Sequence, residues 1–510
     1  MSEKGLAQKV LGGAAWVLLE QFCVQGLNFA LGMILARLLT PQDYGSVAVV
    51  MVFLNVAMVL VGSGFGQALI RKKNADDLDF SSVFYVSVMI ASVAYAALFA
   101  FSPWIADFYR MPELKGVLRV LGANLIFYAI NSVQSAELLK EMRFDLVLRV
   151  SLITAMTSAV VGVSLAFFGG GVWALVWSSS LSSVAGVVAR WFFVRWKPRL
   201  EFSLARVKPL YAFGWKLMVS QLMYVGMNNL YGFVIGRMYS GASLAYVNKA
   251  NNFPELIKNN LNVALIEVSY PALSKMNDDL PRLRNSIRRL LKVNVATVAP
   301  VMVLLALTAH DCILLLYGRQ WLPCVPYMRL FCVGAAIACL GGVNIQAATA
   351  LGRSDVVLKM MVVKSGLALL LICAVLPFGI LEWTASMALA YWPIVTLIDM
   401  LIGRSTVKYE LSCQALDVLP TVLAFALACG GGMLLGLPIR GDSVCCLILR
   451  LMTVWGGSGL VYAFLLIAFK LDIAKEFLSL GARRFPSRFS AFRFLLAYVG
   501  VADVSNERRD

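Results

Sequence analysis

Long apolar stretches separated by short polar segments run along almost the whole chain. A helix needs about 20 mostly apolar residues to cross a hydrocarbon core of about 30 Å. Residues 150–189 contain no Asp, Glu, Lys or Arg and are interrupted at Gly169-Gly170-Gly171. At about 1.5 Å per residue, this stretch predicts two crossings joined by a tight turn. The same pattern elsewhere predicts an all-α polytopic membrane protein with about 14 transmembrane helices.

Polar interruptions of the apolar stretches set the limits of these spans. The predicted spans cover residues 11–39, 44–69, 82–101, 117–138, 150–168, 172–193, 210–238, 243–273, 290–309, 325–351, 356–376, 383–402, 416–435 and 444–469. The external loops between them are short. A membrane glycosyl polymerase or ligase needs a large external loop with catalytic carboxylates or arginines, so the chain is not predicted to be an enzyme.

Polar and glycine positions of the first span recur 200 residues later. The pairs are Gln21 and Gln221, Gly26 and Gly226, Asn28 and Asn228, Gly32 and Gly232, and Arg37 and Arg237. Apolar similarity between two membrane helices is common, whereas a shared polar pattern indicates an internal duplication. Six spans separate the two copies, so both enter the membrane in the same direction and form a parallel repeat.

This repeat predicts two lobes of six helices each. The N-terminal lobe covers residues 1–208 and the C-terminal lobe residues 209–410. The basic connection around Pro198 is predicted to be the linker between the lobes. Two extra helices occupy residues 411–470, and residues 471–510 form a basic tail that is predicted to lie in the cytoplasm or on the inner leaflet.

Composition and charge narrow the class of protein. The chain is 60% hydrophobic and 14% charged, with a mean hydropathy of +0.78, which excludes a soluble enzyme. The net charge of +17 does not indicate a nucleic-acid partner, because the basic residues lie in loops between spans. Most of the 45 lysines and arginines fall in alternate loops that share one side of the membrane. Cytoplasmic loops carry the excess of Lys and Arg, so both termini are predicted to be cytoplasmic.

The ten cysteines are scattered and have no metal-ligand spacing, so neither a metal site nor a cofactor is predicted. Cys312 and Cys324 flank one external loop. They either form a disulfide or are unpaired small apolar residues, and the second interpretation is favoured.

One predicted span carries a polar face. Asn248, Asn252, Glu255, Asn259 and Asn262 recur at steps of four, three, four and three residues, which places them on one side of a helix. Lysines at positions 249 and 258 widen this face. Ionisable and amide groups at membrane depth are costly unless they face a bundle interior or a water-filled cavity. The polar face is therefore predicted to line a transport cavity.

Several short motifs resemble the polysaccharide-exporter branch of the multidrug/oligosaccharidyl-lipid/polysaccharide flippase superfamily. They are the segments at residues 36–45 (ARLLTPQDYG), 111–114 (MPEL), 142–144 (MRF), 270–274 (YPALS), 318–321 (GRQW) and 351–353 (LGR). Each is weak alone, but their order and spacing make the match specific over roughly residues 10–360. The chain is most similar to exporters of colanic acid, teichuronic acid and related polymers.

The resemblance implies two six-helix lobes around a central cavity, with two extra helices. Its members move undecaprenyl-diphosphate-linked oligosaccharide to the periplasmic leaflet of the bacterial inner membrane by alternating access, for exopolysaccharide or O-antigen export. The implied partners are the lipid-linked oligosaccharide, membrane lipids and polysaccharide polymerase machinery. Relatives that carry peptidoglycan precursors have arginines in the first two spans. Residues 44–70 have no charge here, so an anion site must be built differently.

A diphosphate-linked glycan needs cationic donors beside amides in a wet cleft. The candidate substrate-binding residues are Lys216, Lys249, Lys258, Asn248, Asn252, Asn259, Gln21, Gln25, Asn28, Gln221 and Asn228. The alternative is that the lysines extend to the nearer membrane interface or pair with Glu255, while the amides join helices to each other.

Two carboxylates are candidates for coupling export to a H⁺ or Na⁺ gradient, because a buried carboxylate can release a proton or hold a cation. They are Glu20 and Glu255, although Glu255 can instead pair with Lys258 one turn away. Pro254 lies within the polar face and is the candidate hinge of a rocking lobe.

The sequence leaves rival functions open. A cation-coupled multidrug antiporter of the same superfamily needs fewer cavity amides and a smaller cleft. A scaffold without transport activity also remains open. The export of a lipid-linked oligosaccharide is the favoured hypothesis.

Overall fold

The computed structural model describes residues 3–469 except residues 63, 73–74, 142, 195, 263–272, 274–275, 277–278, 437 and 440. Of residues 3–19, 21, 213, 216, 262 and 354 it describes the backbone alone. Every regular element within this described part is a helix, which confirms the all-α prediction. The tail predicted at residues 471–510 lies outside the described residues.

Residues 1–248 form one compact unit. Its helices are α1 (Glu3–Leu38), α2 (Pro41–Gly62), α3 (Phe65–Arg71), α4 (Asp77–Tyr109), α5 (Leu114–Gly122), α6 (Asn124–Lys140), α7 (Phe144–Phe167), α8 (Val172–Phe193) and α9 (Leu204–Met238). Helix α2 is central in this unit and contacts α4, α5, α6, α8 and α9. The predicted tight turn separates α7 from α8, with Gly169 and Gly171 at φ angles of 79° and 51°.

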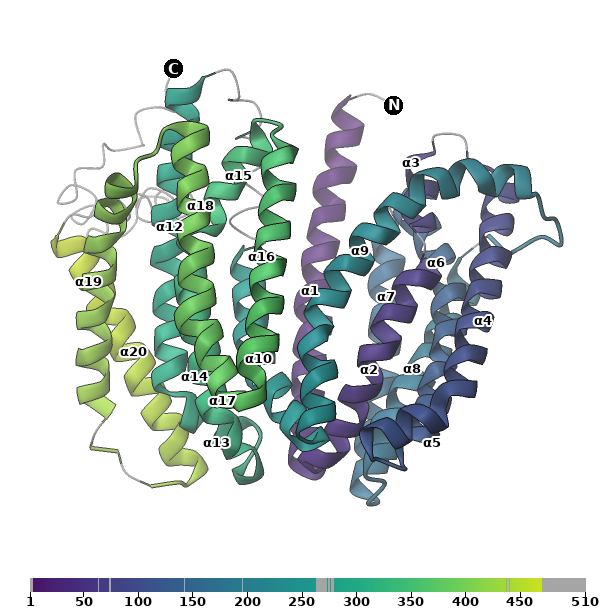
Figure 1. Cartoon of the computed structure of the whole chain (residues 1–510), viewed down its shortest axis with the longest axis horizontal. Coiled ribbons are helices and arrows are strands. Elements are labelled where there is room, and N and C mark those ends of the chain that lie inside the picture. The colour runs from purple at the N-terminus through teal and green to yellow at the C-terminus, as the bar shows by residue number, and fades with distance from the viewer. Residues whose placement is uncertain are drawn as a thin grey trace. The chain divides into compact units, whose positions relative to one another are not determined.

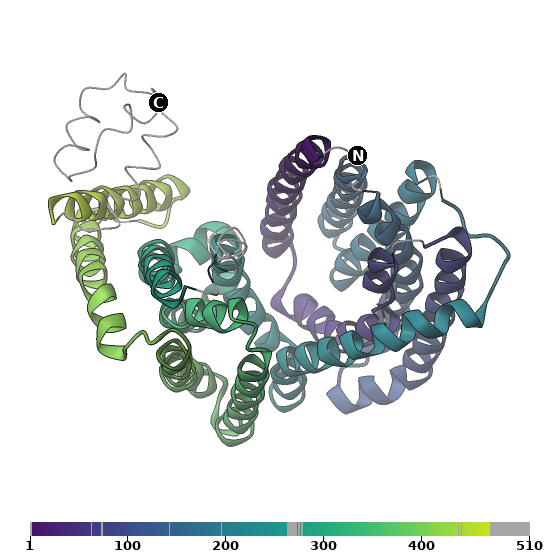
Figure 2. The same cartoon turned by 90° about the horizontal axis from the view of Figure 1, so that it is seen from above.

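Residues 249–510 form the second unit. The remaining helices are α10 (Gly241–Asn262), which begins before the boundary, α12 (Leu280–Leu307), α13 (Ala309–Leu316), η2 (Arg319–Cys324), α14 (Val325–Ala338), α15 (Gly342–Ala350), α16 (Ser354–Val375), η3 (Leu376–Phe378), α17 (Ile380–Ser386), η4 (Met387–Tyr391), α18 (Trp392–Val407), α19 (Leu411–Gly436) and α20 (Val444–Ala468). Helix α12 packs against α14, α15 and α19 (Figure 1). Helices α19 and α20 lie at one edge of this unit, at the yellow end of the colour scale (Figure 2).

Helix α9 lies with the first unit because it packs against α2, α3 and α4. The boundary between the two compact units therefore falls after Asn248, within α10. The boundary between the two lobes at residues 208 and 209 was predicted from the sequence repeat, and it stays a prediction.

The helix boundaries follow the 200-residue repeat. Helices α1 and α9 end at equivalent positions, and α2 and α10 begin at equivalent positions. At the first break the Thr40 hydroxyl accepts a hydrogen bond from the Asp43 N–H at 3.3 Å. At the second, the Ser240 hydroxyl accepts one from the Ser243 N–H at 3.1 Å. A hydroxyl side chain thus caps the following helix at the same place in both copies.

Eleven helices in the described ranges are long and apolar enough to cross a membrane. The chain is therefore a multi-pass membrane protein, but the predicted count of 14 spans is not confirmed. The three other predicted spans correspond to α1, α9 and α10, and residues 263–272 of the last one lie outside the described residues. In α1 the described apolar part is Phe22–Leu38. In α9 and α10, the amides and lysines of the predicted cavity lower the apolar content.

The predicted linker around Pro198 is attached to α4 by several contacts. Arg199 pairs with Asp77 at 2.6 Å, and Arg206 pairs with Asp76 at 3.4 Å. Trp196 is buried against the aromatic side chains of α4. This connection therefore holds the start of α9 against the first unit.

The cap of α4 predicts a pH dependence. Asp76 accepts a hydrogen bond from the Asp79 N–H at 3.0 Å, and this bond, with the charges of Arg206 and Lys72, lowers the pKa of Asp76. A carboxylate whose pKa is lower in the folded chain stabilises the fold at higher pH and loses that contribution as the pH falls through the folded pKa.

The stability of the protein should therefore fall as the pH drops below about 4. Asp76→Asn keeps a capping acceptor but has no charge to titrate, so it should lose less stability over the same range. Thermal unfolding in detergent at pH 3 to 6 measures the difference. Parallel curves for the two proteins would contradict this role of Asp76.

Candidate substrate-binding site

The first unit contains a pocket where the chain breaks between α2 and α3. Gly64 has a left-handed conformation, with φ of 68°, immediately before α3 begins. A Cβ at Gly64 would lie 2.5 Å from the carbonyl oxygen of Gly214 in α9, so the two backbones meet at this point. Because Gly62, Gly64 and Gly66 carry no side chains, space remains beside the break.

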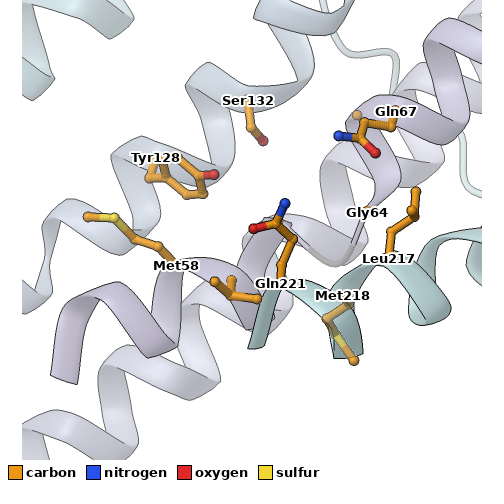
Figure 3. Close-up of a pocket in the computed structure, with 11 residues that line it drawn as sticks. Met58, Gly64, Gln67, Tyr128, Ser132, Leu217, Met218 and Gln221 are labelled. Carbon is orange, nitrogen blue, oxygen red and sulfur yellow. The ribbon is translucent and has the colours of Figure 1, made fainter. Parts of the chain in front are cut away.

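Four helices, α2, α3, α6 and α9, surround this space, which has a volume of about 280 Å³. Its lining residues are Met58, Val59, Gly62, Gly64, Gly66, Gln67, Tyr128, Ser132, Leu217, Met218 and Gln221. Figure 3 shows the polar ends of Gln67, Tyr128 and Gln221 turned toward the same space. We refer to it as the glutamine pocket.

The polar side chains of the glutamine pocket are uncharged hydrogen-bonding groups. Ser132 donates its hydroxyl hydrogen to the Ala129 carbonyl at 2.9 Å. Among the described residues, the side chains of Gln67, Tyr128 and Gln221 have no hydrogen-bond partner in the chain. Among the residues whose side chains are described, the lining includes no Lys, Arg, His, Asp or Glu, and the side chain of Lys216, next to Leu217, is not among them. Each amide carries two donors and an acceptor, and the phenol carries one donor, so these groups are available to a ligand or to water.

Amides also join α9 to its neighbours beyond the pocket. The Asn55 side chain of α2 donates to Asn229 Oδ1 at 3.0 Å, and Asn229 donates to the Val225 carbonyl at 2.7 Å. The Tyr231 hydroxyl donates to Asn248 Oδ1 at 3.3 Å. Asn248, which was predicted to line a cavity, therefore contributes to packing between α9 and α10.

Helix α10 has two distinct faces within the second unit. Ile257 and Leu261 pack against the buried core of that unit, whereas Asn252 and Asn259 are exposed. The polar face was predicted to line a transport cavity, and that role stays a prediction. Pro254 is buried within α10, and its role as a hinge stays a prediction.

Lys258 and Glu255 form the ion pair that the sequence offered as an alternative to substrate binding. The Lys258 Nζ lies 2.6 Å from Glu255 Oε2, with the two side chains 20% and 43% exposed. The lysine therefore already has a counter-ion on its own helix. A diphosphate at Lys258 has to compete with this carboxylate.

Lys249 is 8% exposed and lies against aromatic rings of its own unit. Its ammonium is 5.0 Å from the ring centroid of Tyr317 and 5.6 Å from that of Trp321. Aromatic faces stabilise a cation through their quadrupole. These contacts hold Lys249 of α10 against Tyr317 and Trp321 within the second unit, a structural role that differs from the predicted contact with substrate in a wet cleft.

Glu20 lies in a polar cluster that joins α1 to α7 and α8. Its carboxylate accepts a hydrogen bond from the Ser151 hydroxyl at 2.7 Å and interacts with the charge of Arg190. Arg190 in turn donates to Asn131 Oδ1 at 2.9 Å. The cluster gives Glu20 a neighbouring cation, which the sequence did not predict.

The other predicted residues whose side chains are described do not line the glutamine pocket. Gln25 is half-buried, while Asn28 and Asn228 are exposed. Asn228 donates to the Tyr224 carbonyl of its own helix at 2.9 Å. The side chains of Gln21 and Lys216 lie outside the described residues.

No disulfide is formed by the ten cysteines, all of which lie in described parts of the chain. Cys312 and Cys324 are both buried, so the interpretation as small apolar residues is confirmed. Within the described ranges, no three His, Cys, Asp or Glu side chains gather where they could hold a metal ion.

Sequence reasoning found Gln221 through the repeat but missed Gln67, Tyr128 and Ser132. One signal for Gln67 was present, since an amide follows three closely spaced glycines inside an apolar stretch. Tyr128 and Ser132 are one helical turn apart and share a face of α6. Nothing in their spacing indicates that this face meets α9.

Comparisons with known proteins agree with the predicted resemblance. The family model described as "Polysaccharide biosynthesis protein" matches residues 34–326. The succinoglycan biosynthesis transport protein ExoT of Rhizobium meliloti is 27% identical over 331 residues, which are 65% of this chain and 67% of the relative. The lipopolysaccharide biosynthesis protein WzxC of Escherichia coli is 25% identical, with 71% and 74% covered. The teichuronic acid biosynthesis protein TuaB of Bacillus subtilis is 21% identical, with 79% and 83% covered.

Solved structures share the fold. The lipid II flippase MurJ in an inward closed conformation aligns with a TM-score of 0.68 at 16% identity, over 89% of this chain and 98% of its own. An inward-facing multidrug resistance transporter of the MATE family, in the MOP superfamily, aligns with a TM-score of 0.59 at 14% identity, over 78% and 98%. The family model covers more than half of the chain, and the helical fold agrees with it. The chain is therefore a member of the polysaccharide biosynthesis protein family.

Proposed function

We propose that the protein is a flippase that moves undecaprenyl-diphosphate-linked oligosaccharide repeat units across the bacterial inner membrane. The observation that carries this proposal is the glutamine pocket, where the exposed side chains of Gln67, Tyr128 and Gln221 bring uncharged hydrogen-bonding groups together in a unit with membrane-spanning helices. Such groups are costly in lipid and are retained where they meet a polar ligand or water. The names of the relatives, which concern polysaccharide biosynthesis and transport, support the same substrate class.

The proposal includes transport by alternating access of two repeat-related lobes and no catalytic step. The exposed amides of α10, Asn252 and Asn259, are suited to line the route of the glycan. In this proposal both termini lie in the cytoplasm, on the side of the membrane whose loops carry most of the Lys and Arg residues. Lipids and the polysaccharide polymerase machinery are the expected partners.

Coupling to a H⁺ or Na⁺ gradient is part of the proposal, with Glu20 favoured over Glu255. Glu255 has a counter-ion one turn away on the same helix. Glu20 instead links three helices through Ser151 and Arg190, so a change of its charge alters contacts between elements. Ionophores that abolish one gradient at a time would identify the coupling ion in the assay below.

Deletion of the gene should trap lipid-linked repeat units in the cytoplasmic leaflet and abolish the surface polymer. The leaflet distribution can be measured in spheroplasts with a membrane-impermeant glycan-modifying enzyme, and a plasmid copy should restore it. A normal distribution in the deletion strain would reject the flippase. Increased drug sensitivity with normal polymer would instead favour a multidrug antiporter.

A further inference from the structure

We propose that the glutamine pocket binds one neutral sugar ring of the transported lipid-linked oligosaccharide, and that the diphosphate binds elsewhere. This inference rests on the proposed function and names the part of the substrate that meets Gln67, Tyr128 and Gln221.

The charge of the pocket excludes the diphosphate. A diphosphate carries at least two negative charges, and its binding requires cationic donors such as Arg or Lys. None of the lining residues whose side chains are described is basic. The Tyr128 hydroxyl and two amides donate hydrogen bonds but leave the charge of an anion uncompensated, so a diphosphate loses more solvation here than it regains.

The chemistry of the lining matches a sugar ring. Sugar hydroxyls both donate and accept hydrogen bonds, as do the amides of Gln67 and Gln221. The C–H faces of the ring are apolar and fit against Met58, Leu217 and Met218. A pocket with mostly apolar walls and a few converging polar groups is typical of small-molecule sites.

An acyl or polyprenyl chain fits this pocket less well. It has no hydrogen-bonding groups, so it displaces water from Gln67, Tyr128 and Gln221 and leaves these groups unsatisfied, which is costly. The volume of about 280 Å³ lies just below the range of about 300–1,000 Å³ that is usual for ligand pockets. It is suited to one ring and not to a whole repeat unit.

The break between α2 and α3, which is rich in glycine, accounts for the position of the glutamine pocket. Gly62, Gly64 and Gly66 bring backbone in place of side chains to one wall of the pocket, and the contact of Gly64 with Gly214 holds that wall against α9. The two glutamines come from the two elements joined by this contact, α3 and α9. The distance between their amides is therefore set by backbone packing.

Binding of defined lipids to the full-length protein in nanodiscs tests the inference. The probes are undecaprenyl diphosphate, its galactosyl and glucosyl derivatives, and its galacturonosyl derivative. At least one neutral glycosyl lipid should bind about tenfold tighter than undecaprenyl diphosphate. The galacturonosyl lipid should bind less tightly than the galactosyl lipid, because its carboxylate meets no cation among the described lining residues.

Gln221→Leu and Gln67→Leu should each remove most of this difference, bringing the two affinities to within about twofold. Neither should change the affinity for undecaprenyl diphosphate. Gln42→Leu is the matched control, because Gln42 is exposed at the other end of α2 and should retain the tenfold preference. Thermal unfolding confirms that each variant is folded.

The outcomes separate this inference from the proposed function. An equal loss of affinity for undecaprenyl diphosphate in Gln221→Leu, or tighter binding of the galacturonosyl lipid, would overturn the sugar pocket while leaving the flippase intact. The sugar pocket would also be overturned if no glycosyl lipid binds tighter than undecaprenyl diphosphate. If neither the glycosyl lipids nor undecaprenyl diphosphate binds the wild-type protein, the proposed function itself fails.

Discussion

Replacement of Gly64 by alanine is expected to destabilise the first unit by about 2–4 kcal/mol. The residue has a φ of 68°, a conformation that is strained for residues with a Cβ. The added methyl group would also lie 2.5 Å from the Gly214 carbonyl oxygen and 2.8 Å from its Cα. Both atoms belong to the backbone of α9 and cannot move aside as the end of a flexible side chain does.

Chemical or thermal unfolding in detergent measures this effect, and Gly226→Ala in α9 is the control. A Cβ at Gly226 has no heavy atom within 4 Å, so this change should leave stability equal or higher, because alanine favours the helix by about 1 kcal/mol. If Gly64→Ala also separates α3 from α9, binding of the neutral glycosyl lipid should weaken. A Gly64→Ala protein as stable as the wild type would show that the two backbones are not in contact.

Replacement of Asp417 by asparagine is expected to cost about 2–3 kcal/mol and to loosen α19 from α12. The Asp417 side chain is 6% exposed and receives contacts from three donors. Arg288 Nη2 donates to it at 2.7 Å and the Tyr409 hydroxyl at 2.7 Å, while Lys292 Nζ lies 3.2 Å away. Arg288 is 47% exposed, so water can partly replace the carboxylate, which limits the loss.

Two measurements distinguish this effect from a general loss of charge. Asp442→Asn removes an exposed partner of Arg319 at 3.5 Å and should cost less than about 0.5 kcal/mol. In a protein whose only cysteine is Cys429, which is buried on α19, maleimide labelling should be faster for Asp417→Asn than for the wild type. Equal labelling rates would indicate that α19 stays in place without this ion pair.

Much of the fold could be predicted because apolar stretches of fixed minimum length dictate membrane helices. The repeat was also readable from polar pairs such as Gln21 and Gln221, and the hydroxyl caps at Thr40 and Ser240 agree with it because they begin helices at equivalent positions. The predicted count of 14 spans is not confirmed, because three of them, in α1, α9 and α10, are not among the eleven found in the described residues. Amides and lysines lower the hydropathy of α9 and α10.

The candidate site was only partly predictable. Periodicity predicted a shared polar face for Asn252 and Asn259, and both are exposed while Ile257 and Leu261 pack against the core. That this face lines a cavity stays a prediction. It assigned Lys249 to the same polar face, although tertiary packing buries this lysine under Tyr317 and Trp321. The spacing of residues on one helix does not specify which neighbour each of them meets.

The sequence by itself determined the membrane-spanning helical class, the duplicated helices and the family, because these depend on apolar length and on local motifs. Only the tertiary structure decided which amides face a common space. Gln67 and Gln221 lie 154 positions apart in the chain, and they line one pocket because backbone contact at Gly64 and Gly214 brings α3 and α9 together. Such a contact depends on the absence of side chains from two distant segments at once, and no pattern within either segment encodes it.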